Sequence, residues 1–165
     1  MGGSADARRD ILVAVIDEAF HHKAWHGPNL RGAVRRVDAK QAAWRPKPGR
    51  HSIAEIIVHC AYWKYAIRRR LRGDKRGSFP IKGSNWFALP QVLYEAEWRG
   101  YVKLLDAQHE ALRETVATSS WTILGPGLGG SVARPAHRVY GIAMHDVYHA
   151  GQIQTLKALY KSAKV

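Results

Sequence analysis

The stretch "SIAEIIVHCAYWKYAIRRRLRG", residues 52 to 73, decides the fold prediction. Its first four residues form a capping box: the Ser52 hydroxyl accepts from the Glu55 N–H, and Glu55 reaches back to the backbone of Ser52. Seven residues then recur at the spacing of one helix face: Ile53, Ile56, Ile57, Cys60, Lys64, Ile67 and Leu71. The stretch therefore predicts a helix that runs to about Arg72.

Outward from this helix, further helical segments alternate with loops punctuated by Gly and Pro, and no segment shows strand-like alternation. We expect long helices at about 4–25, 90–118 and 136–161, a short helix at 30–37, a turn at 38–44, and loops at 73–90 and 119–135. The pattern predicts an all-α four-helix bundle with short extra helices and a long crossover loop. At 165 residues, positions 1–165 are expected to form one domain.

The composition excludes some classes of protein and leaves one question open. No apolar run reaches the length of a transmembrane helix, the first residues lack the apolar core of a secretory signal, and the single cysteine, Cys60, fits a reducing cytoplasm. The net charge of +13 is strongly basic, and "RRRLRGDKR" (residues 68 to 76) is its densest cluster. This cluster is either a solvated helix end, stabilised by the helix dipole, or a surface that attracts nucleic acid or an anionic substrate.

A second stretch, "HDVYHAGQI" (residues 145 to 153), raises the question of a metal site. On a helical wheel His145 and His149 lie ~40° apart. They share their face with Ile142, Tyr148, Gln152, Leu156 and Leu159, which predicts that this face points inward. Nine histidines make such spacing common by chance, and His22 and His26 repeat it. Buried imidazoles nevertheless need partners, which a divalent metal would supply, and His59 at the edge of its own apolar stripe is the best third ligand.

Together, "HSIAEIIVHCAYWKYAIRRRLRG" and "HDVYHAGQI" resemble the DinB/YfiT-like family of helical metalloproteins over almost the whole chain. The resemblance implies a four-helix bundle in which His59, His145 and His149 bind a divalent ion, commonly zinc or nickel. It also implies an activity of the thiol S-transferase or thiol-dependent isomerase type, with a low-molecular-weight thiol as partner, and a homodimer.

Other residues near the three histidines have weaker assignments. Gln152 is predicted to hydrogen-bond a ligand histidine or a metal-bound water, and Tyr148 is either a proton donor or a packing residue. Asp146 points away on the wheel and is not expected to be a ligand. Glu55 could accept a hydrogen bond from the second ring N–H of His59, but its capping role competes with that and is the preferred assignment. Cys60, in the centre of its stripe, is expected to be an inert core thiol.

The ends of the helices suggest what surrounds the site. If the first two long helices are antiparallel neighbours, Trp25, His26 and His51 rim its mouth, unless these histidines are simply exposed helix-end residues. By the same reasoning the glycine-rich loop 119–135 would lie at this end and serve as a lid.

Three classes of function remain at this point. The first is a metal-dependent enzyme, a thiol transferase or a hydrolase acting on a small electrophile. The second is a non-enzymatic, stress-related bundle in which the metal holds helices together. The third is a basic bundle that associates with nucleic acid through phosphate contacts, without a recognised base-reading motif.

Overall fold

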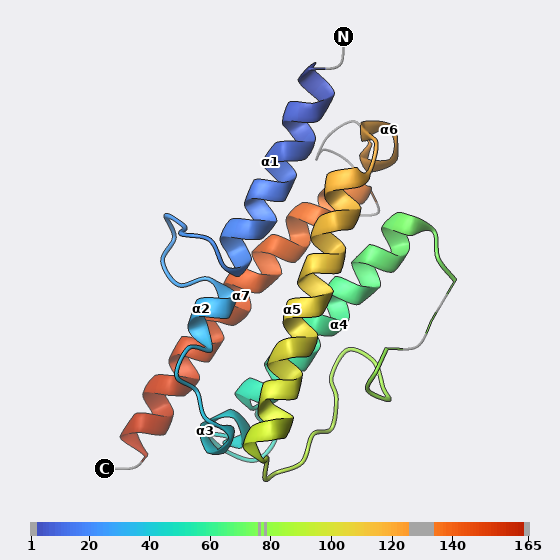
Figure 1. Cartoon of the computed structure of the whole chain (residues 1–165). Helices are drawn as coiled ribbons and strands as arrows, with labels where there is room; N and C mark the ends of the chain where they lie inside the picture. The colour runs from blue at the N-terminus through green and yellow to red at the C-terminus, as the bar shows by residue number, and fades with distance from the viewer. Residues whose placement is uncertain (1–2, 76, 78, 126–133, 164–165) are drawn as a thin grey trace.

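The structure is a computed structural model that describes residues 3–75, 77, 79–125 and 134–163, and these form helices with no strand beyond one isolated bridge (Figure 1). The long helices are α1 (Gly3–Phe20), α4 (Ile53–Arg72), α5 (Glu95–Thr118) and α7 (Pro135–Ser162). The short ones are α2 (Leu30–Ala33), α3 (Ala39–Ala43) and α6 (Trp121–Leu124). The predicted all-α bundle is confirmed. Within these residues, every helix is too short or too polar to cross a membrane.

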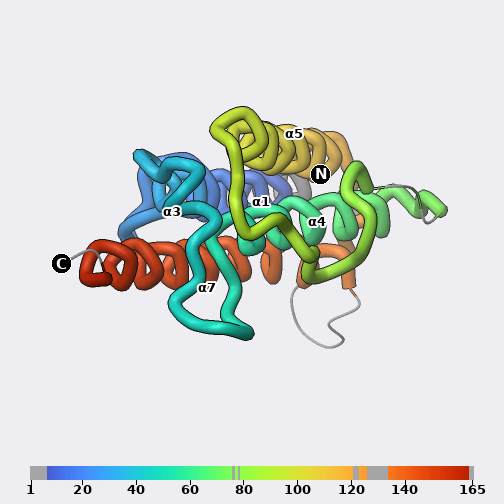
Figure 2. The backbone as a smooth tube through the Cα atoms, turned by 90° about the horizontal axis from the view of Figure 1, so that it is seen from below, coloured from blue at the N-terminus to red at the C-terminus, as the bar shows by residue number. Residues whose placement is uncertain are grey.

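The long helices form a ring in which each packs against two others. Both α1 and α4 contact α5 and α7, so α1 and α4 face each other across a diagonal. Figure 2 shows the same arrangement, with α5 and α7 on opposite sides of the bundle. Helices α4 and α5 run in the same direction, and α1 and α7 run in the opposite one (Figure 1). The segment between α4 and α5 must therefore return along the whole bundle, as a crossover.

Helix α4 begins and ends where the sequence predicts. The Glu55 carboxylate accepts from Ser52 N at 2.8 Å, and Ser52 Oγ accepts from Glu55 N at 3.2 Å, so both halves of the capping box are present. At the other end Gly73 adopts a left-handed conformation with φ 70°, which glycine reaches at no steric cost. The helix is thus bounded by its own sequence, which fixes His59 in its second turn.

Three other boundaries differ from the prediction. Helix α1 ends at Phe20, not Trp25, because the residues that follow offer no apolar face to bury; Trp25 itself is fully exposed. Helix α2 covers only Leu30–Ala33 of the predicted 30–37. Helix α5 begins at Glu95 and not near Pro90. At this start the Glu97 side chain accepts a hydrogen bond from Tyr94 N at 2.8 Å. That residues 1–165 form one domain stays a prediction.

Candidate metal centre

The face of α7 that points into the bundle is not centred where the wheel predicts. Tyr148 and Leu159 were expected inside, but they are 63% and 46% exposed. The buried set includes Val139, Ala143, Asp146, Ala150 and Ile153 as well as His149. The helix is therefore rotated so that Asp146 occupies the centre of the inward face and His145 lies at its boundary, half-buried.

The three predicted histidines converge. His59 Nε2 lies 3.0 Å from His145 Nε2, and His149 Nε2 lies 3.1 Å from the same atom. Two ligands of one tetrahedral zinc ion, each at ~2.0 Å from it, would be ~3.3 Å apart. The three residues, whose ligand atoms all lie within 4.8 Å of one another, can thus share one ion.

The hydrogen-bond partners of the ring nitrogens show why this cluster suits a cation. His59 Nδ1 lies 2.8 Å from Asn85 O, and His149 Nδ1 lies 2.7 Å from Gln152 Oε1. Because those oxygens can only accept, both Nδ1 atoms carry the proton and both neutral rings leave Nε2 bare. His145 has one proton to offer and faces two bare nitrogens, so lone pairs oppose each other at the centre of the cluster.

Protonation of the three imidazoles does not remove this repulsion between their lone pairs near neutral pH. Burial, together with the neighbouring imidazoles, lowers the pKa of His145 to about 3. Burial also lowers the pKa of His149 to about 4 and brings that of His59 below its usual value. Three neutral imidazoles with converging lone pairs are the donor set that zinc and nickel bind.

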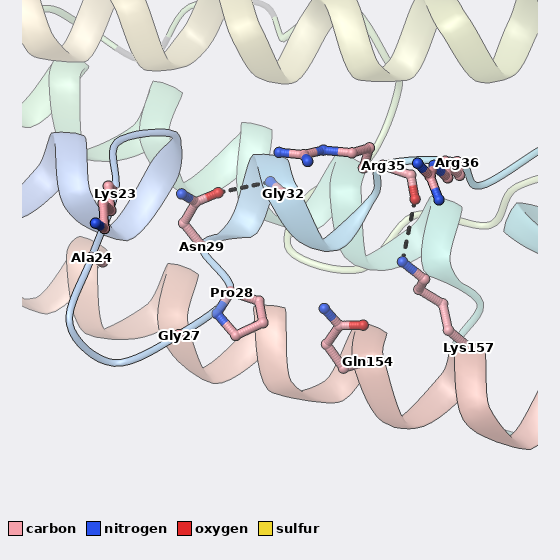
Figure 3. Close-up of a pocket in the computed structure, with 10 residues that line it drawn as sticks. All are labelled: Lys23, Ala24, Gly27, Pro28, Asn29, Gly32, Arg35, Arg36, Gln154 and Lys157. Carbon is pink, nitrogen blue, oxygen red and sulfur yellow. Dashed lines mark hydrogen bonds between the residues drawn. The ribbon is translucent and has the colours of Figure 1, made fainter.

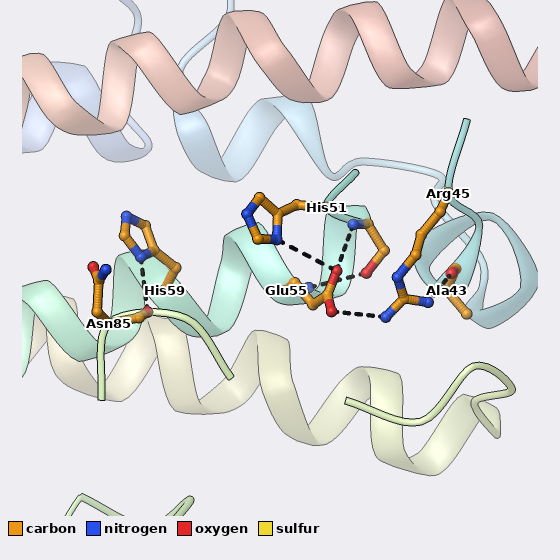
Figure 4. Close-up of polar contacts among 7 residues, drawn as sticks. Ala43, Arg45, His51, Glu55, His59 and Asn85 are labelled. Carbon is orange, nitrogen blue, oxygen red and sulfur yellow. Dashed lines mark hydrogen bonds and ion pairs between the residues drawn. The ribbon is translucent and has the colours of Figure 1, made fainter. Parts of the chain in front are cut away.

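The crossover segment supplies a contact that the sequence did not reveal. Asn85 has φ 61°, a left-handed conformation that asparagine tolerates. Its backbone carbonyl accepts a hydrogen bond from His59 Nδ1 (Figure 4). Its side-chain oxygen accepts from Trp63 Nε1 at 3.0 Å. Glu55, the alternative acceptor, is instead engaged by Ser52 N and by Arg45 at 2.7 Å. The capping role of Glu55 is confirmed, and Asn85 is the residue that orients His59.

An aromatic stack covers one side of the cluster. Trp86 lies parallel to His59, with ring centroids 3.9 Å apart, and His51 lies on the other face of Trp86 at 3.6 Å. His51 therefore belongs to the surroundings of the site, as predicted. Trp25 and His26 do not line the adjoining cleft, because α1 and α4 are diagonal rather than neighbouring helices.

Two clefts adjoin the cluster, one beside His149 and the other beside His145. One, of about 320 Å³, is bordered by His51, Trp86, Tyr148, His149 and Gln152, with Arg50 and Ile56 on its wall. The other, of about 290 Å³ and mostly apolar, is bordered by Trp63, Ile67 and His145. The first is the size of a small-molecule pocket and carries the polar groups such a pocket needs.

A larger, basic cleft of about 510 Å³ lies elsewhere, between α2 and α7 (Figure 3). Lys23, Arg35, Arg36 and Lys157 line it, and Lys157 donates to Ala33 O at 2.9 Å and to Arg35 O at 3.3 Å. Size alone does not make it the site of chemistry, because its lining holds cations but no histidine or carboxylate. It accounts for part of the basic charge.

Gln152 takes up the position predicted for it. Its Oε1 accepts from His149, and its Nε2 donates to the Tyr148 hydroxyl at 2.9 Å. Gln152 therefore holds the His149 ring in one tautomer. Tyr148 borders the cleft and is an exposed side chain, so packing in the core is not its role.

A buried ion pair beside the cluster escaped the sequence analysis. Lys64 and Asp146 are each 1% exposed in their side chains and are hydrogen-bonded to each other, tying α4 to α7. Asp146, His145 and Cys60 also lie close enough to hold an ion. However, the Lys64 ammonium already occupies the carboxylate, and burial raises the pKa of the Cys60 thiol well above its usual value. Cys60 is confirmed as a core residue.

The predicted lid does not follow from this fold. Because α4 and α5 are parallel, Thr118 at the end of α5 lies at the opposite end of the bundle from the start of α4 (Figure 1). The described part of the segment, α6, contacts α1 and α7. Residues 126–133, the glycine-rich centre of the predicted lid, lie outside the described residues.

Comparison with protein families gives one match. Residues 21–153 match the family described as the DinB superfamily. This matched segment includes α4, the crossover segment, α5 and most of α7. Neither the curated proteins nor the solved structures gave a match to the chain. The matched segment contains all three clustered histidines and covers well over half of the sequence, and on that ground the chain belongs to the DinB superfamily.

Proposed function

We propose that this chain is a metal-dependent enzyme in which His59, His145 and His149 hold a divalent ion, zinc or nickel. The observation that carries the proposal is the convergence of three histidine Nε2 atoms, at 3.0 and 3.1 Å, beside an open cleft. A closed structural zinc site has four protein ligands, whereas three protein ligands and an adjoining cleft are typical of a catalytic site.

The reaction class we propose is transfer of a low-molecular-weight thiol to a small electrophile, with hydrolysis as the alternative. When bound, the ion would lower the pKa of a thiol or water that reaches it. The protein holds the ligands: Asn85 orients His59, and Gln152 orients His149. The 320 Å³ cleft would orient the electrophile against Trp86 and Ile56.

Tyr148 is the proposed proton donor of this reaction. Its oxygen accepts from Gln152 Nε2, so its own O–H is directed away from Gln152. Because Tyr148 borders the cleft beside His149, its hydroxyl would be near a substrate held there and could protonate a leaving group. A reducing cytoplasm suits both a thiol substrate and the lone cysteine, and we propose that the protein is located there. That the chain forms a homodimer, and that it contacts nucleic acid, stay predictions.

The test is elemental analysis of protein purified without a histidine tag. We expect His145→Ala to lose one equivalent of metal that His26→Ala, which removes an exposed imidazole outside the cluster, retains. With the metal restored, we expect thiol conjugation to chlorodinitrobenzene in the wild type and none in His145→Ala. Equal metal content in the two variants would overturn the metal centre. Stoichiometric metal without thiol conjugation or hydrolysis would favour the non-enzymatic bundle.

A further inference from the structure

A second cluster of ligand-type side chains lies away from the three histidines, where α1 meets α5. It consists of Asp17 and His21 at the end of α1 and His109 on α5, and their ligand atoms lie within 4.8 Å of one another. His21 directly follows the last residue of α1, and its backbone N donates to Asp17 O at 2.9 Å, so the helical turn continues far enough to bring the two side chains together. Neither the proposed catalytic role nor the capping of the helices uses these residues.

His109 is the observation that points to a ligand. It is fully buried, and across the described residues neither of its ring nitrogens has a hydrogen-bond partner. One face of its ring stacks on Phe20 with centroids 3.8 Å apart. A buried imidazole left without a partner is costly and calls for an explanation, of which a bound ion and a bound water are two.

The distance to Asp17 separates these explanations. His109 Nε2 lies 3.5 Å from Asp17 Oδ1, which is too long for a good hydrogen bond but close to the ~3.3 Å between two ligands of one tetrahedral ion. The buried ring nitrogen and the buried carboxylate oxygen thus face each other across a gap that a shared ion would fill.

The guanidinium of Arg113 already contacts Asp17, at 2.9 Å from both carboxylate oxygens. It does not block a cation as Lys64 blocks Asp146, because the Arg113 side chain is 38% exposed and can turn toward solvent, whereas that of Lys64 is 1% exposed.

We propose that Asp17, His21 and His109 form a second binding site for a divalent transition ion such as Zn²⁺, which ties α1 to α5. Two nitrogens and one carboxylate oxygen are a ligand set that zinc accepts. His21 is exposed, so the ion can enter from solvent. The site is independent of the three-histidine cluster and stands even if that cluster binds nothing.

The experiment measures Zn²⁺ stoichiometry by titration calorimetry of metal-free protein. The variants are His21→Ala, the matched control His26→Ala, and His145→Ala/His149→Ala, which dismantles the first cluster. We expect His21→Ala to bind one Zn²⁺ fewer than wild type, His26→Ala to match wild type, and His145→Ala/His149→Ala to retain one ion. Adding His21→Ala to that last variant should remove it. The proposal is overturned if His21→Ala matches wild type, or if His26→Ala loses as much.

Discussion

Replacing Lys64 by methionine tests how the bundle tolerates the buried carboxylate of Asp146. Both side chains are 1% exposed, so the variant leaves one charge in the core without a partner. A pair at ~4 Å with an effective dielectric constant of ~20 interacts by about 4 kcal/mol, and breaking a buried pair costs about 3–5 kcal/mol. We expect Lys64→Met to lower the free energy of unfolding by that amount, a large part of the stability of a small domain.

The pH dependence of this loss identifies its cause. Burial raises the pKa of Asp146 to about 6 even with Lys64 present. Without Lys64 the pKa rises further, so the folded variant takes up a proton that the unfolded chain does not. Stability of the variant should then fall as pH rises, by about 1.4 kcal/mol per unit until Asp146 ionises in the folded state. The loss should be smaller at pH 6 than at pH 8.

Urea unfolding followed by circular dichroism measures both effects. Lys103→Met, on the exposed face of α5, is the control and should stay within about 0.5 kcal/mol of wild type. Lys64→Met/Asp146→Leu should recover most of the loss, because a well-packed apolar pair replaces the ions. A loss below about 1 kcal/mol that does not change with pH would refute the reasoning.

Three further predictions concern the histidine cluster and its neighbour. Gln152→Leu should weaken metal binding by about 10- to 100-fold, because His149 loses the acceptor that fixes its tautomer; calorimetry measures this, and an unchanged affinity would contradict it. The folded-state pKa values of His145 and His149, about 3 and 4, lie below ~6.5 in the unfolded chain. The stability that these low pKa values contribute to metal-free protein should therefore be complete above pH 6.5 and shrink as pH falls toward 4. The raised pKa of Asp146 has a smaller effect in the opposite direction. Urea midpoints measured at pH 7 and pH 5 test this prediction. Cys60 should react with a thiol reagent only on unfolding, since burial keeps it protonated, and fast labelling of native protein would count against a core position.

The sequence was most informative where a local contact decides the structure. The capping box at Ser52 predicts the first residue of α4, and with it the position of His59, because both partners lie within four residues. The spacing of His145 and His149 likewise predicts one shared helix face. The direction of α5 was predicted inconsistently: the length of segment 73–90 indicated a crossover, whereas the lid prediction placed the end of α5 beside the start of α4, and only the crossover agrees with the structure.

The wheel error on α7 has a physical cause in residue types. Polarity placed Asp146 outside and Tyr148 inside, but a buried cation from α4 makes the carboxylate the better core residue. A partner on another helix cannot be seen in the periodicity of one helix. Asn85 escaped for the same reason, since nothing in its neighbours indicates that its carbonyl will meet His59.

The ion pair and the histidine cluster are linked by this rotation of α7. With Asp146 anchored at the centre by Lys64, His145 is carried to the edge of the inward face, where it borders a cleft. Had His145 taken the central position, the three nitrogens would lie among aliphatic side chains, away from both clefts. The ion pair of Lys64 with Asp146 therefore sets the rotation of α7 against α4. In this rotation the imidazoles are buried enough to stay neutral and still lie beside the two clefts.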